Sequence, residues 1–220
     1  MRRLLAVLLL AFAAATASGQ DWAGELKMID NDLRTEQYAH ARKWSIKMIN
    51  SMCEHLGTGP DAMYTLALTT AYRAMAEAGL KNMDDADWYW HVALSMYPKL
   101  AKNDWKPYGE PGELLARDHS DEFKISDSET ARPVPLSKAD PKCPLSAIQG
   151  GYYQPVTVRA VVGPDGSVRC PTLVNASSAP TLIYAATEAL KQWQFQPASV
   201  DGTAVAMNYD LTVNFAPPRQ

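Results

Sequence analysis

The sequence predicts an α+β protein in which an α-helical N-terminal domain precedes a small ββαβ domain with a three-stranded antiparallel sheet. Two observations carry this prediction. Apolar residues recur at helical spacing through residues 22–102, a pattern typical of packed helices. Between residues 155 and 215 the apolar period changes from two to three or four and back to two. That order indicates two strands, one helix and a final strand.

Residues 1–19 have the features of a secretory signal peptide. Arg2 and Arg3 precede the apolar stretch Leu4 to Ala15, and Ala15-Thr16-Ala17 is a small-x-small cleavage signal. The apolar stretch is short for a membrane-spanning helix. We therefore expect a periplasmic protein that begins near Ser18 or Gln20. The alternative is that residues 4–15 are retained as a membrane anchor.

Residues 20–103 are expected to form the helical domain, and their last helix carries a repeat-like spacing. A small residue, an aromatic residue, an alanine and a proline follow at +4, +3 and +5, as in the second helix of a tetratricopeptide repeat: Ala86, Trp90, Ala93 and Pro98. The preceding helix fits the repeat only if about five residues are added to the turn between them. The domain is thus predicted to be tetratricopeptide-like, with a generic helical bundle as the alternative.

Three consecutive aromatic residues, Trp88, Tyr89 and Trp90, lie in that last helix. Neighbours on a helix point about 100° apart, so the three cannot all face one core. Trp90 fits the repeat core. We therefore expect Trp88 or Tyr89 to be exposed or to face another element.

Residues 104–141 are predicted to be a linker. Five prolines interrupt the range, and residues 117–129 are polar and of mixed charge. Such a composition does not favour a packed core. One short helix is compatible with residues 112–117.

The C-terminal domain, residues 142–217, begins with a predicted β-hairpin over residues 155–174, whose turn is Gly163-Pro164-Asp165-Gly166. The next helix has Ser177 or Ser178 as its candidate N-cap and Pro180 near its first turn. One apolar face of that helix is predicted to meet the sheet: Leu182, Ala185, Ala186, Ala189, Leu190 and Trp193. After Gly202, strict alternation through residues 205–215 predicts the last strand.

These motifs, over roughly residues 135–217, resemble the TonB C-terminal domain family. The residues that carry the resemblance are Asp165-Gly166-Ser167-Val168, Asn175-Ala176-Ser177-Ser178, Trp193-Gln194-Phe195-Gln196-Pro197-Ala198 and Asp201-Gly202. The resemblance implies that the last strand pairs with a short segment of an outer-membrane transporter. The partner-binding residues would then be Ala206, Met207, Asn208, Tyr209, Asp210, Leu211, Thr212 and Val213.

Three cysteines follow the signal peptide, and an exported protein can keep a disulfide. Cys143 just precedes the hairpin and Cys170 lies within it, so a Cys143–Cys170 bridge is our hypothesis. Cys53 is expected to be a small buried apolar residue.

The remaining patterns do not favour an enzyme, a metal site or a cofactor. The four histidines have no ligand spacing, and the common nucleophile and phosphate-binding motifs are missing. A net charge of −3 without a basic stripe argues against nucleic acid as a partner. We therefore expect an exported, non-enzymatic protein that binds a protein or peptide by β-strand addition. The alternatives are a membrane-anchored energy transducer and a structural envelope protein that forms a homodimer through its sheet edge.

Overall fold

The computed structural model describes residues 21–57, 60–116, 131–175 and 179–215. The predicted signal peptide, the middle of the predicted linker and the candidate N-cap residues Ser177 and Ser178 lie outside these ranges. Ala179 is the N-cap residue of the helix that follows, and Pro180 occupies its first turn. A proline there removes only an N–H that has no partner within the helix.

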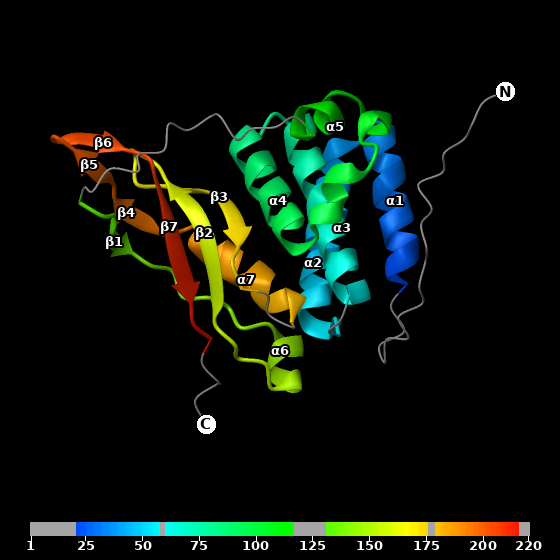
Figure 1. Ribbon diagram of the computed structural model, residues 1–220. Helices are drawn as coiled ribbons and strands as arrows, with labels where there is room; N and C mark the ends of the chain where they lie inside the picture. The colour runs from blue at the N-terminus through cyan, green and yellow to red at the C-terminus, as the bar shows by residue number, and fades with distance from the viewer. Residues whose placement is uncertain (1–20, 58–59, 117–130, 176–178, 216–220) are drawn as a thin grey trace.

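The N-terminal half is helical, as predicted. Four long helices are followed by two short 3-10 turns and a short helix (Figure 1): α1 (Trp22–Arg34), α2 (Tyr38–His55), α3 (Pro60–Gly79), α4 (Met83–Met96), η1 (Pro98–Lys102), η2 (Lys106–Tyr108) and α5 (Gly109–Leu115). Asp84 and Asp85 lie in the first turn of α4, where carboxylates are favoured by the helix dipole. α3 packs on both α2 and α4.

Part of the range expected to be a linker is folded onto the helices. Trp105, Tyr108 and Leu115 are buried, and the Trp105 ring meets Trp90 edge-on at 5.3 Å. Proline content misled the expectation here, because the aromatic residues between the prolines bury enough apolar surface to order η2 and α5.

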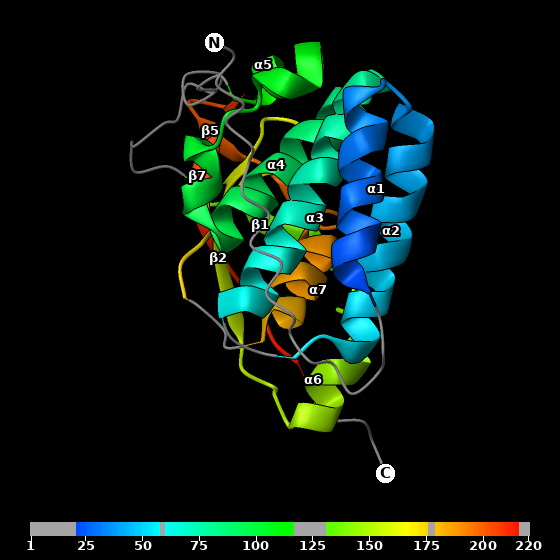
Figure 2. The same cartoon turned by 90° about the vertical axis from the view of Figure 1, so that its right-hand side faces the viewer.

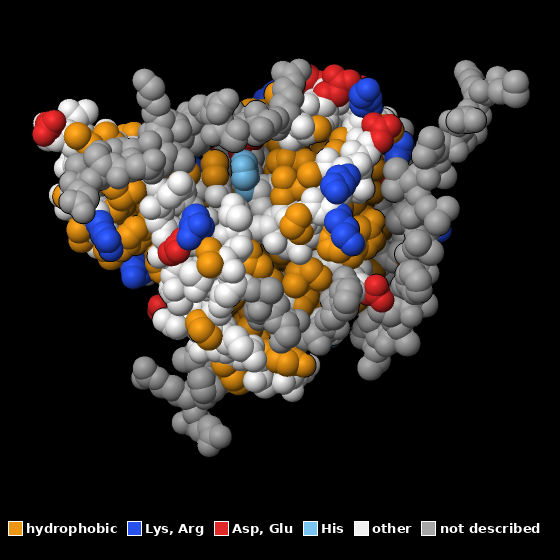
Figure 3. Space-filling model, viewed as in Figure 1, with side chains coloured by type: hydrophobic (Ala, Val, Ile, Leu, Met, Phe, Trp, Pro, Cys, Tyr) orange, Lys and Arg blue, Asp and Glu red, His pale blue; other side chains and the backbone are white. Residues whose placement is uncertain are grey.

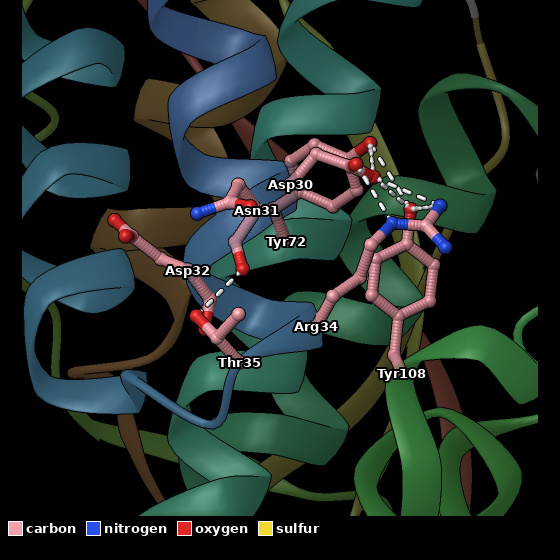
Figure 4. Close-up of polar contacts among 7 residues, drawn as sticks. All are labelled: Asp30, Asn31, Asp32, Arg34, Thr35, Tyr72 and Tyr108. Carbon is pink, nitrogen blue, oxygen red and sulfur yellow. Dashed lines mark hydrogen bonds and ion pairs between the residues drawn. The ribbon is translucent and has the colours of Figure 1, made fainter.

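A polar cluster joins η2 to α1 and α3 (Figure 4). The Asp30 carboxylate accepts hydrogen bonds from Arg34 Nε (2.8 Å), from the Tyr72 hydroxyl (3.1 Å) and from the Tyr108 hydroxyl. Burial is the main cause that raises the pKa of both tyrosines. Their hydroxyls therefore stay protonated and can donate to Asp30.

The C-terminal half has the predicted ββαβ order, with two additional pairs of short strands. The main sheet has the order β3-β2-β7 and is antiparallel. β1 pairs with β4, and β5 pairs with β6. The bounds are β1 (Val134–Ser137), α6 (Leu145–Gly150), β2 (Val156–Val162), β3 (Val168–Leu173), α7 (Pro180–Leu190), β4 (Gln194–Gln196), β5 (Ala198–Val200), β6 (Thr203–Val205) and β7 (Met207–Val213).

The predicted last strand over residues 205–215 is divided in the structure. Val205 ends β6, Ala206 is a buried residue between the strands, and β7 runs from Met207 to Val213. The β5–β6 turn is formed by Asp201 and Gly202, both with positive φ. Two positive φ values in a two-residue loop are the mark of a type I′ hairpin turn.

α7 lies between the sheet and the N-terminal helices (Figures 1 and 2). Ten of its eleven residues are buried, so both of its faces are covered. Its contacts are with β2 on one side and with α3 and α4 on the other. A helix that is apolar all round must be enclosed, and here the second enclosing layer is the N-terminal half of the chain.

Candidate partner-binding edge

The candidate site is the outer edge of β7. β2 is the central strand of the sheet, and each of its seven residues pairs with one of β7, from Val156 opposite Val213 to Val162 opposite Met207, without a bulge. Among the strands that the structure describes, β7 pairs with β2 alone. One edge of β7 therefore carries backbone groups that the sheet does not use.

The register shows which residues present those groups. The Thr157 carbonyl accepts from the Val174 N–H at 2.9 Å, so Thr157 directs its backbone groups toward β3. Backbone direction alternates along a strand, so Val158 and its even-numbered neighbours direct theirs toward β7. Their partners in β7 are the odd-numbered residues. The N–H and C=O groups of Asn208, Asp210 and Thr212 thus point away from the sheet.

The opposite edge, formed by β3, is closed by three features. The pairing of β2 with β3 shifts between Arg159 and Val161, which leaves Cys170 and Pro171 in a bulge opposite one residue. Cys170 has a positive φ of 49°, and Pro171 has no N–H to offer. α4 packs against β3 as well. Bulges, prolines and a covering helix are the usual means by which proteins block an edge strand.

The side chains of β7 follow the predicted alternation. Leu211 and Val213 are buried in the core, whereas Asn208, Asp210 and Thr212 are exposed on the other face. Met207 and Tyr209 also face the core but remain half-exposed. The Tyr209 ring meets Phe195 edge-on at 6.3 Å. The core face is therefore incompletely covered at the first half of this edge.

On the exposed face, β7 is tied to β2 by side chains. Arg159 donates from Nε to Asp210 Oδ1 at 2.8 Å and from Nη2 to Oδ2 at 3.0 Å. Thr157 and Thr212 share a hydroxyl hydrogen bond of 3.1 Å. The hydrogen bond from Arg159 lowers the pKa of Asp210, so this carboxyl is ionised at neutral pH.

Acidic and basic side chains lie scattered among hydrophobic and other side chains on the face drawn in Figure 3.

A second polar group of residues joins α7 to the N-terminal helices. Arg73 of α3 donates from Nη1 to the Tyr184 hydroxyl at 2.6 Å and lies over the Tyr89 ring at 3.7 Å. Lys191, the C-cap residue of α7, donates to Asp85 at 2.5 Å. Tyr184 and Lys191 lie seven residues apart, on one side of the helix. This face of α7 was missed by the sequence reasoning, which assigned one apolar stripe to the helix.

Trp88, Tyr89 and Trp90 are all buried. Because three consecutive residues of a helix point in different directions, two surfaces are needed to bury them. One is the core of the N-terminal half, and the other is the C-terminal half. Trp90 faces Trp105, whereas Tyr89 faces Arg73 and Lys191. We expected Trp88 or Tyr89 to be exposed or to face another element. Tyr89 is the residue that faces another element, because its ring contacts Lys191, the C-cap residue of α7.

The predicted Cys143–Cys170 disulfide is not formed. Cys143 precedes α6, which packs on α2, whereas Cys170 lies in β3, which packs on α4, so the two segments are held by different helices. Cys53 of α2 packs against the core, and burial raises the pKa of its thiol to about 12. A thiol with such a pKa is unreactive at neutral pH.

The described residues hold neither a candidate membrane span nor a candidate metal site. Within the described part of the chain, no helix combines the length and the apolar character that crossing a membrane requires. Over the same residues, His, Cys, Asp and Glu side chains form no group of three or more that could hold a metal ion.

Comparison with known families confirms the predicted family of the C-terminal domain. Residues 139–217 match the family described as the Gram-negative bacterial TonB protein C-terminal. The match begins after β1 and covers the three-stranded sheet, α7 and the two short strand pairs apart from β1. A search of curated proteins found no match to the chain.

Proposed function

We propose that this protein, whose residues 139–217 form a TonB C-terminal domain, binds an extended segment of a partner protein by adding it as a fourth strand beside β7. Such a domain points to TonB-type transport. The partner would be an envelope protein such as an outer-membrane transporter. The protein would act in the periplasm, without catalysing a reaction, after export by the signal peptide predicted in residues 1–19.

The observation that carries this proposal is the difference between the two sheet edges. The β3 edge has a bulge, a proline and a covering helix, whereas the β7 edge has a regular register and three residues with outward backbone groups. An added strand obtains its affinity from main-chain hydrogen bonds. Of the two edges of the main sheet, only the β7 edge offers an uninterrupted row of them.

The helical half is proposed to hold the C-terminal sheet in place and to block one of its edges. It encloses the second face of α7 and packs on β3, so it restricts strand addition to one side of the sheet. This role does not depend on whether the helices belong to the tetratricopeptide class.

The test is a nuclear magnetic resonance titration with a synthetic peptide of alternating valine and threonine. Binding is expected to shift the amides of Asn208, Asp210 and Thr212 more than those of Tyr209 and Leu211, because only the first group points to the edge. Unshifted amides along β7 on saturation with peptide would sink the proposal.

A pair of variants isolates the backbone contribution. Thr212→Pro removes one outward N–H, and Thr212→Val keeps that N–H while losing the same hydroxyl contact with Thr157. We expect the proline variant to bind the peptide about 5- to 10-fold more weakly than the valine variant. Equal affinities would show that the Thr212 N–H takes no part in binding.

A further inference from the structure

Strand addition at β7, if it occurs as proposed, leaves open which segments the edge accepts. We infer that Asp210 is the specificity-determining residue of the edge: it selects a partner segment that places a basic residue opposite it and disfavours both acidic segments and a second copy of this chain.

Asp210 is placed to contact a partner strand directly. It is the middle one of the three residues with outward backbone groups, and its side chain is exposed. An added strand lies about 4.8 Å from β7. The residue of the partner that is hydrogen-bonded to Asp210 therefore places its side chain directly beside the carboxylate, on the same face of the sheet.

The partner side chain at this position meets the negative charge of Asp210 first. Arg159 lies on β2, one strand further from the edge, and holds the Asp210 carboxylate through two hydrogen bonds. A partner residue is thus about one strand spacing from the negative group and about two from the positive group. The nearer charge dominates, so a lysine or arginine completes an alternating row of three charges, whereas a glutamate meets a like charge.

The other face of the added strand lies on the core side of the sheet. Met207 and Tyr209 are half-exposed on the core face beside the edge. Side chains of the added strand that flank the basic residue in sequence point to that face. Apolar residues there would cover Met207 and Tyr209. The segment that fits is amphipathic, with apolar residues at alternate positions around a central basic residue.

The same position argues against a second copy as the occupant. Antiparallel pairing of two β7 strands that uses all three outward residues places Asp210 opposite Asp210, with Asn208 opposite Thr212. Like charges directly opposite each other destabilise a strand pair. The free protein is therefore expected to stay monomeric at this edge.

The experiment compares two synthetic peptides of about nine residues that alternate threonine and valine and carry Lys or Glu at the central threonine position. We expect the Lys peptide to bind the full chain about three- to tenfold more tightly at low salt, with the difference shrinking at high salt. Equal affinities would overturn the selectivity of Asp210 and leave strand addition standing. Binding of neither peptide would remove the proposed function as well.

A charge-swapped variant is the matched control. The double variant Arg159→Asp, Asp210→Arg keeps an ion pair across β2 and β7 but puts the positive group at the edge, so the preference should reverse toward the Glu peptide. Asp210→Asn serves if the double variant does not fold, and it should abolish the preference for Lys. A preference that survives both changes would assign the selection to another residue.

Discussion

Position 166, in the Asp-Gly motif of the β2–β3 turn, requires glycine because of its backbone conformation and because of its close neighbours. Its φ is +77°, and a Cβ at this position would overlap the Phe195 carbonyl oxygen. The Gly166 carbonyl in turn accepts the Phe195 N–H at 3.0 Å. We expect Gly166→Ala to lower the free energy of unfolding by about 2–4 kcal/mol. Gly202→Ala is the control, because Gly202 has a similar φ of +80° in open space, and it should cost about 1 kcal/mol. Denaturant unfolding measures both, and equal losses would contradict the steric argument.

Burial of the Cys53 thiol predicts that the stability of the protein falls at alkaline pH. The thiol has an ordinary pKa near 9, raised by burial to about 12. The folded state therefore holds the proton while the unfolded state releases it. The stabilisation from Cys53 is complete below pH 9 and is lost as the pH rises from 9 toward 12, by about 1.4 kcal/mol at pH 10. Between pH 8 and pH 10, the free energy of unfolding should fall further for the wild type than for Cys53→Ala. The variant is a matched control, because it keeps every tyrosine that titrates in the same range. An identical fall in both proteins would exclude this role for the thiol.

At the scale of the element, α7 is held by a hydrogen bond from a half-buried arginine. Arg73 and Tyr184 lie on α3 and α7, and a hydrogen bond to a charged group contributes about 1.5–3 kcal/mol. Tyr184→Phe should lower the free energy of unfolding by about that amount. Tyr64→Phe, also in a helix, is the control, because its ring packs on Tyr97 and it should cost little. A double-mutant cycle with Arg73→Met should give a coupling of at least 0.5 kcal/mol. A coupling near zero would mean that the two helices are held by apolar packing alone.

Elements with local sequence signals could be predicted, whereas features that depend on distant parts of the chain could not. The β2–β3 hairpin, α7 and β7 were predicted because their periodicity and turn residues are local signals. The Tyr184 face of α7 was not, because its partners on α3 and α4 lie far away in the chain. β1 and β4 are short, and β1 is exposed along its whole length, so no period marks them. For the candidate site, alternation predicted the exposed residues of β7. Pro171 was a usable signal that β3 is an edge strand unsuited to pairing, whereas the role of Arg159 depends on the register.

For the whole molecule, the enclosure of α7 predicts that the two halves fold together. The buried residues form one continuous cluster that runs from Trp22 to Phe215. A fragment beginning at residue 131 would expose the Tyr184 face of α7, together with the part of β3 that packs on α4. We expect this fragment to lose cooperative unfolding or to self-associate. The full chain should unfold in one transition with the same midpoint by far-ultraviolet circular dichroism and by tryptophan fluorescence.

If the fragment unfolds cooperatively and remains monomeric in sedimentation, the helical half is dispensable for the stability of the TonB C-terminal domain. Two separated transitions in the full chain would indicate the same. A peptide titration of such a folded fragment would then show whether the helices still control the edges. Binding at β3 as well as β7 would mean that α4 closes the β3 edge, and binding at β7 alone would mean that the bulge and Pro171 suffice.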